Sequence, residues 1–272
     1  MKTILAAGCD AVYVGLAGFS ARPASAEFSM DEIKEAVQVC HDSGVKLHVA
    51  VNAVVGAGNE GKAREALTAL DAAGVDAVIL ADYPLLSYAC RTFQHAAVHA
   101  SCLLGCLNTP NVQFLKDMGV SCLVFSTNAT AEEMAGITSA LPTLEYEIVA
   151  QGGICFNDNR MCEMAHVMRD GNLLVYCQLD YDLTDGNGKV LSPAKRIGCR
   201  HIASQEMIRF YKELGIGTLK IEGRTMPAEE IARKVRLLKD AVQASEALCG
   251  KESFPTCSLH YISREKQAGG RQ

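Results

Sequence analysis

The sequence predicts an α/β fold of the TIM-type (β/α) barrel class, and a repeated phrase is the first reason. Five segments share a small or apolar residue, a glycine, and then a short run rich in Val, Ile and Leu. Such a glycine suits the left-handed position that ends a helix, and the run after it is typical of a buried strand. The copies are AGCDAVYVG (7–15), SGVKLHVAVN (43–52), AGVDAVILAD (73–82), MGVSCLVFS (118–126) and LGIGTLKIEG (214–223).

Helical patterns between these phrases are the second reason. Amphipathic segments at 31–43 and 63–73 precede two of the copies, and capping boxes begin at Ser29 and Thr130. Two more apolar runs, 96–104 and 145–156, raise the total to about seven strands. Nearly continuous apolar strands that alternate with helices indicate a parallel sheet covered on both faces.

A doubly wound sheet and a barrel both fit this alternation. No glycine-rich dinucleotide fingerprint follows the first strand, so we favour a barrel that lacks its first strand. We expect Met1 to Gly8 to be helical and Asp10 to Gly15 to form a strand exposed on the side where the missing strand would pair. The predicted organisation is one barrel domain over 1–248, a cysteine-rich insertion at 155–200 after the seventh strand of the barrel, and a tail at 249–272.

Composition excludes several classes of protein. The formal net charge is −5 and the pI is near 5.8, so there is no overall basic footprint for nucleic acid, although a local basic patch stays open. No window of 18 uncharged apolar residues occurs, which argues against a membrane span. The N-terminal MKTILAAG is too short for a leader, because Asp10 interrupts it and the repeat continues through it. We expect a cytoplasmic protein.

Polar side chains stand at the C-terminal ends of the predicted strands, where parallel barrels place their chemistry. In KIEGR, the three charged residues alternate with Ile221 and Gly223, which puts them on one face of a strand. Inside a barrel such charges require partners, so they form either an ion network or a site for an anionic small molecule. The candidate substrate-binding residues are Asn52, Asp82, His99, Ser101, Lys220, Glu222 and Arg224.

Twelve cysteines are more than an ordinary cytoplasmic enzyme contains, yet the chain is large enough to bury a core without disulfides. Most of them occupy positions where a small apolar residue would serve. Four lie within 45 residues, in a segment that interrupts the helix–strand repeat: Cys155, Cys162, Cys177 and Cys199. Their spacing matches neither paired zinc knuckles nor the short-spaced ferredoxin run.

Several segments together resemble the peptidase U32 family, also called collagenase-like. They are DAVYVG, FSARPASAEFSMDEI, the HAS at 99–101, EIVAQGGICFNDNRMC at 147–162, and KIEGR. The resemblance implies a TIM-type barrel and, in some branches, a 4Fe-4S cluster on four cysteines. It places Cys155, Cys162, Cys177 and Cys199 as the ligands, and Arg22 of the FSARP segment joins the expected substrate-binding residues.

The branches that carry the cluster serve oxygen-independent hydroxylation of ubiquinone or of RNA bases, with prephenate as oxygen donor. The resemblance therefore implies hydroxylation, or related chemistry, on a carboxylate-bearing small molecule or a nucleobase. Two alternatives stay open. The family name implies a peptidase, although neither GxSxG nor HExxH occurs. A partner-dependent subunit without activity of its own, acting in a homo- or hetero-oligomer, is the other. Catalytic residues are not assigned.

Overall fold

The computed structural model describes residues 1–21, 27–53, 55–56, 58–154, 180–196, 199–223 and 226–249. Several residues predicted to be functional lie outside these ranges: Arg22, Cys155, Cys162, Cys177 and Arg224. Most of the predicted cysteine-rich insertion and nearly all of the predicted tail lie outside them as well.

The described part of the chain forms an α/β fold with eight parallel strands, consistent with a TIM-like barrel. All seven predicted strands are present, and a two-residue strand, β2, adds to them. The sheet order is β2-β1-β3-β4-β5-β6-β7, and β11 pairs with β7. The strands are β1 (Ala11–Leu16), β2 (Glu27–Phe28), β3 (Lys46–Val51), β4 (Ala77–Leu80), β5 (Ala97–Ala100), β6 (Cys122–Val124), β7 (Glu145–Ile154) and β11 (Thr218–Ile221).

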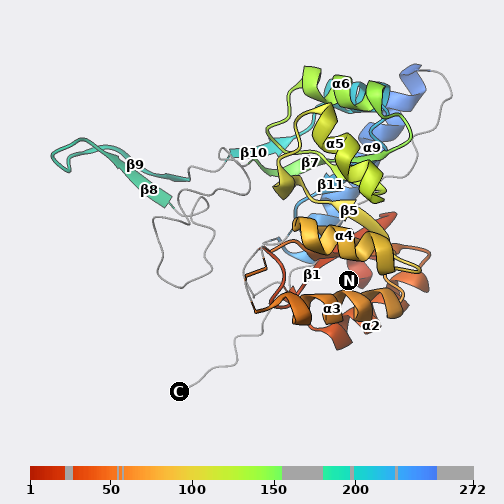
Figure 1. Cartoon of the computed structure of the whole chain (residues 1–272). Helices are drawn as coiled ribbons and strands as arrows, with labels where there is room; N and C mark the ends of the chain where they lie inside the picture. The colour runs from red at the N-terminus through yellow and green to blue at the C-terminus, as the bar shows by residue number, and fades with distance from the viewer. Residues whose placement is uncertain are drawn as a thin grey trace.

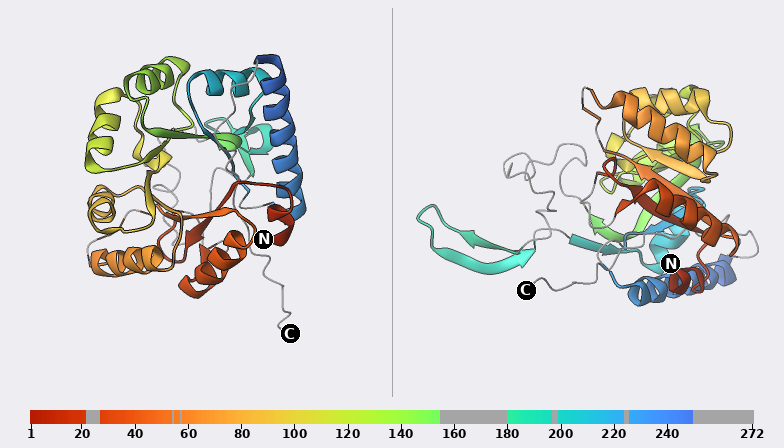
Figure 2. Two further views of the ribbon diagram at one scale, coloured as in Figure 1. Left: turned by 90° about the vertical axis from the view of Figure 1, so that its right-hand side faces the viewer. Right: turned by 90° about the horizontal axis from the view of Figure 1, so that it is seen from below.

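Helices surround the curved sheet, as the left view of Figure 2 shows. Both predicted capping boxes form: Ser29 accepts from the Glu32 backbone N–H, and Thr130 accepts from that of Glu133. The helices are α1 (Lys2–Leu5), α2 (Met30–His41), α3 (Glu60–Ala72), α4 (Tyr83–Thr92), α5 (Thr109–Met118), α6 (Ala131–Ala140), α8 (Gln205–Glu213) and α9 (Ala228–Cys249), with a 3₁₀ turn at Cys102–Leu104.

Alternation along each strand separates two environments. One set of side chains, including Val12, Leu47 and Val78, packs under the helices in the main hydrophobic cluster. The other set faces the interior of the curved sheet, where a small second cluster contains Tyr13, Ala50, Ile79 and Val124. Polar residues on these inward positions are therefore held inside the barrel rather than at its surface.

The N-terminal region differs from the expectation in one respect. A short helix, α1, precedes β1, and Gly8 has the left-handed φ of +85° that the repeat predicts. The expected exposed edge is wrong, because all six residues of β1 are buried. On the side away from β3, β2 pairs with Gly15 and Leu16, while α1 packs against α9.

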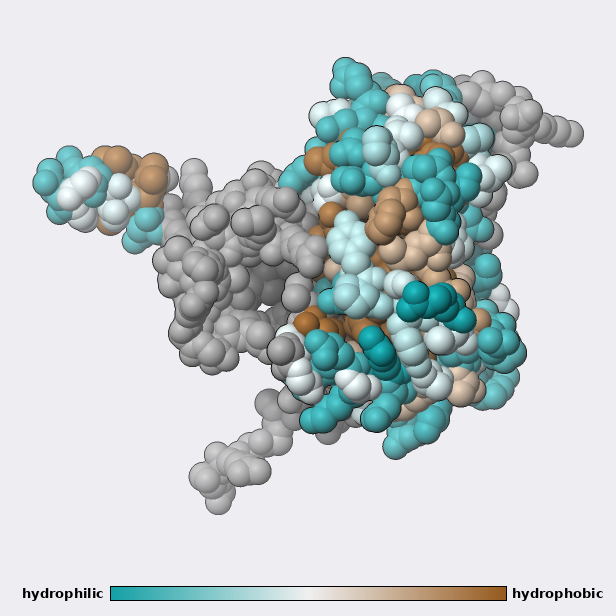
Figure 3. Space-filling model, in the orientation of Figure 1, coloured by the Kyte–Doolittle hydropathy of each residue, from teal (hydrophilic) through white to brown (hydrophobic). Residues whose placement is uncertain are grey.

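A two-stranded antiparallel hairpin, β8 (Asp180–Thr184) and β9 (Val190–Arg196), extends away from the barrel in Figure 1. Asp185 accepts hydrogen bonds from the backbone N–H groups of Asn187 and Lys189, which confirms the predicted turn at 185–188. Leu183, Val190 and Leu191 are exposed on the hairpin, and Figure 3 shows this apolar surface.

A short antiparallel strand, β10 (Cys199–Ile202), continues the sheet beside the end of β7. In the portion of the chain that the structure describes, no helix combines the length and the apolar character needed to cross a membrane.

Candidate functional site

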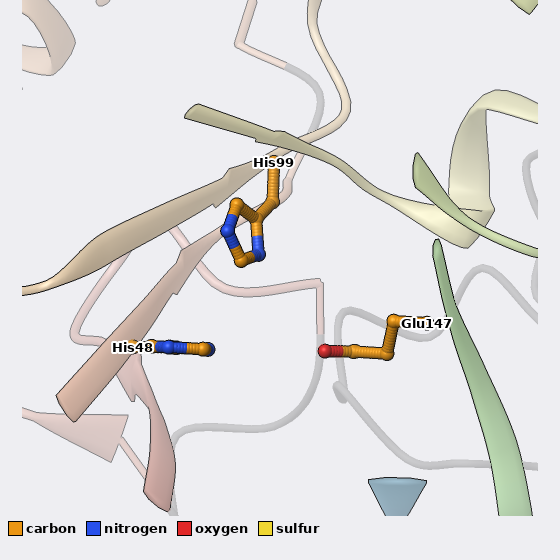
Figure 4. A group of neighbouring side chains, drawn as sticks. All are labelled: His48, His99 and Glu147. Atoms are coloured by element: carbon orange, nitrogen blue, oxygen red, sulfur yellow. The ribbon is translucent and has the colours of Figure 1, made fainter. Parts of the chain in front are cut away.

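Three buried polar side chains from alternate strands meet inside the barrel (Figure 4). They are His48 of β3, His99 of β5 and Glu147 of β7, and each is less than 10% exposed. In a barrel, tilted strands bring the inward side chains of alternate strands to the same height, which makes them one interior layer. The two imidazole rings meet edge to face with centroids 5.1 Å apart. One ligand atom from each of the three residues lies within 4.8 Å of the others.

The intervening strands supply the neighbouring layer. The registers Tyr13↔His48, Ile79↔His99 and Val124↔Glu147 place an inward residue of each intervening strand beside a member of the polar layer. Lys220 of β11 completes this second layer, with its Nζ 4.0 Å from the centroid of the Tyr13 ring. Its side chain therefore lies within the barrel interior.

A buried ion pair joins the two layers. Lys220 Nζ donates to Glu147 Oε1 at 2.5 Å, and both side chains are nearly inaccessible to water. Burial alone would lower the pKa of Lys220, but the charge of Glu147 and the Tyr13 ring outweigh it, so the pKa is raised above its usual value. Lys220 is consequently a cation at neutral pH, and its carboxylate partner comes from a strand 73 positions earlier.

The histidines are neutral for the complementary reason. Burial lowers the pKa of His99 to about 4, and Lys220 contributes in the same direction. Burial also holds the pKa of His48 well below its usual value, with His99 and Lys220 adding to the effect. At neutral pH both imidazoles therefore keep a lone pair, which can accept a proton, accept a hydrogen bond or bind a metal ion.

Further inward positions lead from this interior to the C-terminal ends of the strands. Ser101 is buried, and its Oγ accepts from the Leu103 backbone N–H at the start of the 3₁₀ turn. Asn52 accepts from the Ala21 backbone N–H, which fixes the loop after β1 against the end of β3. Glu222 follows β11, and its backbone N–H donates to the Gln151 carbonyl. These residues surround the mouth of the barrel.

Asp82 has a local structural use. Its Oδ1 accepts from the Leu85 backbone N–H, so it caps the N-terminus of α4, where Pro84 occupies an early helical position. Strand ends and helix caps coincide in a (β/α) unit, and a carboxylate there satisfies the first turn of the following helix. The structure thus accounts for Asp82 without a substrate.

Gly152, beside Gln151 in β7, lies closely against Glu222. A Cβ at this position would lie 2.7 Å from Glu222 Cβ and 3.0 Å from Val149 Cγ1. We expect Gly152→Ala to lower the free energy of unfolding by about 1–3 kcal/mol through overpacking. Chemical denaturation measures this change.

The matched control for this substitution is Gly136→Ala in α6, where a Cβ would have no atom within 4 Å. Alanine is favoured in helices, so the control should stabilise the protein by up to about 1 kcal/mol. Equal effects of the two substitutions would contradict the close packing of Gly152 against Glu222.

The predicted cluster ligands are only partly described. Cys199 begins β10, and its Cα register partner is Ile154, the last residue of β7. Cys155 is the next residue in the sequence, so two of the four predicted ligands belong to segments that meet at the C-terminal end of β7. Among the cysteines whose side chains are described, burial raises the pKa of Cys9, Cys40, Cys90, Cys106 and Cys122.

Of the interior layer, sequence reasoning selected His99 and Lys220 but not His48 or Glu147. A signal was available, because each residue is a polar side chain at an inward position within an otherwise apolar strand. Such isolated polar residues acquire meaning only when the registers show that they share one space.

Comparisons with known proteins agree on one family. A family model described as peptidase family U32 matches residues 1–265. tRNA hydroxylation protein P of Helicobacter pylori (strain J99) is 28% identical, over 96% of this chain and 66% of its own length. The 23S rRNA 5-hydroxycytidine C2501 synthase of Escherichia coli is 29% identical, over 80% of this chain and 33% of its own length.

Among solved structures, the U32 peptidase Mk0906 matches with a TM-score of 0.48 and 17% identity, over 63% of this chain and 73% of that one. The chain spans two thirds or less of the length of the two curated relatives. Because the family model extends over nearly all of the sequence, this chain belongs to peptidase family U32.

Proposed function

We propose that this chain takes part in oxygen-independent hydroxylation of a nucleobase in RNA, using a 4Fe-4S cluster bound by Cys155, Cys162, Cys177 and Cys199. The pairing of Cys199 with Ile154 is the observation that carries the proposal, since it gathers the cysteine-bearing segments at the C-terminal end of β7. Barrel enzymes form their active sites at that end of the sheet. Hydroxylation of tRNA and rRNA, as the relatives are named, supplies the reaction class.

Four thiolates are a suitable donor set for such a cluster. When bound, the cluster would supply electron-transfer chemistry. The role of the described residues is to shape the site beneath it: Asn52 and Ser101 hold the loops at the mouth in place. Glu147 and Lys220 keep a fixed pair of charges inside the barrel. A carboxylate-bearing small molecule is the oxygen donor that we expect, with prephenate as the first candidate.

A basic segment supports RNA as the substrate despite the negative net charge. Between residues 186 and 205 the sequence contains four cationic residues and no aspartate or glutamate: Lys189, Lys195, Arg196 and Arg200. This segment includes most of the β8–β9 hairpin and all of β10, which pairs with β7. A positive stretch beside the barrel mouth suits contacts with phosphates, whose strength falls as salt concentration rises.

Peptidase activity is less well supported. Cys122, His99 and Glu145 lie within 4.8 Å of one another, an arrangement that resembles a thiol nucleophile with its base. However, Cys122 is only 2% exposed, and burial raises the pKa of its thiol well above the usual value. A buried, protonated thiol is a poor nucleophile and is out of reach of a peptide bond.

The test uses anaerobically purified full-length chain, unmodified RNA and prephenate, with mass spectrometry of the RNA nucleosides. We expect a hydroxylated nucleoside, a cluster content of about four iron and about four sulfide per chain, and loss of both in Cys155→Ser and Cys162→Ser. Cys9→Ser and Cys90→Ser are matched controls that should retain both.

A hydrolase would give a different pattern. Peptide release that persists after the cluster is removed, without any hydroxylated nucleoside, would replace this proposal with the peptidase alternative. Hydroxylation that appears only when a second protein is added would assign the chain to a partner-dependent complex.

A further inference from the structure

The interior layer of His48, His99 and Glu147 contains three side chains that are able to bind a metal ion. Their donor atoms are two imidazole nitrogens and one carboxylate oxygen, all within 4.8 Å of one another. Figure 4 shows the rings and the carboxylate directed toward a common space. None of the three belongs to the cysteine set proposed for the cluster, so this layer is a separate feature of the barrel.

An unsatisfied polar atom provides the second observation. Within the described part of the chain, Nδ1 of His99 is buried and has no hydrogen-bond partner. The residue is 6% exposed, so water does not satisfy this atom as it would at the surface. A buried polar group without a partner costs about 1–3 kcal/mol, and native proteins rarely keep one without a ligand or a functional reason.

The donor set narrows the ligand to one chemical class. Two histidines and one carboxylate are found in catalytic zinc sites and in non-haem iron(II) sites. Magnesium and calcium require several oxygen ligands, which this layer does not provide. The ammonium of Lys220 also repels a weakly held cation, so the ion must gain its affinity from bonds to nitrogen.

Lys220 has a compatible role beside such an ion. It donates to Oε1 of Glu147, which leaves the second carboxylate oxygen for coordination. Hydrogen bonds of this kind orient metal-bound carboxylates and are common in metal sites. Ligand atoms around a tetrahedral zinc ion lie about 3.3 Å apart, so small side-chain rotations would have to bring the three groups closer.

We propose that His48, His99 and Glu147 bind one divalent transition-metal ion, of the zinc or iron(II) class, inside the barrel. The site is independent of the iron–sulfur cluster and of the hydroxylation proposed above.

The test measures zinc binding by the cluster-loaded full-length chain in competition with a chelator. We expect one tightly bound Zn²⁺ per chain, and at least tenfold weaker binding in His48→Gln and in His99→Gln. The matched controls are His41→Gln and His95→Gln, because both histidines are exposed. Unchanged binding in the two interior variants, or no zinc binding by the folded wild-type chain, would overturn the proposal.

X-ray absorption at the zinc edge decides the question without any substitution. The proposed site predicts nitrogen and oxygen neighbours at about 2.0–2.1 Å and no sulfur. A sulfur neighbour at about 2.3 Å would assign the ion to a cysteine instead, either Cys122 in the group with His99 and Glu145 or one of the cluster cysteines. Metal bound with sulfur in this way would contradict the His–His–Glu site.

Discussion

Glu147→Leu is expected to lower the free energy of unfolding by about 3–5 kcal/mol, because it leaves the buried ammonium of Lys220 without its carboxylate. In the native chain the attraction between the two charges offsets the cost of removing them from water. With Glu147 gone, Lys220 must either stay charged in the interior or lose its proton, and both states are unfavourable. Urea denaturation with circular dichroism measures the loss.

The double variant Glu147→Leu/Lys220→Met separates the ion pair from general packing. Removing both charges leaves apolar side chains of similar size, so most of the lost stability should return. The surface pair of Lys34 and Asp31 is the matched control, since Asp31→Asn at an exposed pair should cost less than about 1 kcal/mol. A double variant as unstable as Glu147→Leu would refute the buried ion pair as the cause.

Asp71→Ala is expected to lower the free energy of unfolding by about 2–4 kcal/mol, although Asp71 is far from the proposed chemistry. Its buried carboxylate, in α3, accepts from the backbone N–H groups of Gln94, His95 and Ala96 at 2.8–3.0 Å. These bonds hold the connection between α4 and β5, which positions His99. Thermal unfolding compared with Asp117→Asn, an exposed aspartate in α5, measures the effect.

The pH dependence gives a sharper form of the same prediction. Burial would raise the pKa of Asp71, but the three backbone N–H groups lower it further, so the folded pKa lies below the usual value of 3.8. A depressed folded pKa contributes stability above the unfolded pKa and loses it as pH falls through the folded value. The wild type should therefore lose more stability than Asp71→Asn below about pH 4. Parallel curves for the two proteins would contradict this assignment.

The fold was largely predictable because its signals are local. Each repeat glycine ends a helix in a left-handed conformation, as Gly44, Gly74 and Gly215 do, and the apolar run that follows is a strand. The two-residue strand β2 was missed because so short a segment has no pattern of its own. Its glutamate, Glu27, is fixed by the backbone N–H groups of Gly18 and Ser20, contacts that no sequence periodicity indicates.

The interior layer was harder to predict because its contacts are distant in the sequence. KIEGR indicated an inward-facing Lys220 that needs a partner, but 73 positions separate this lysine from Glu147. His48 is a single polar residue in an apolar strand and is compatible with an ordinary core histidine. Only the registers of β3, β5 and β7 bring the three ligand-bearing residues together.

The most direct test of the central claim is the nucleoside composition of RNA incubated anaerobically with the cluster-loaded chain and prephenate. Our account predicts a nucleoside heavier by one oxygen atom, formed by the wild type and by Cys9→Ser but not by Cys155→Ser or Cys162→Ser. RNA left unchanged by a wild-type chain that contains its full cluster, with every candidate partner protein supplied, would contradict the proposed function.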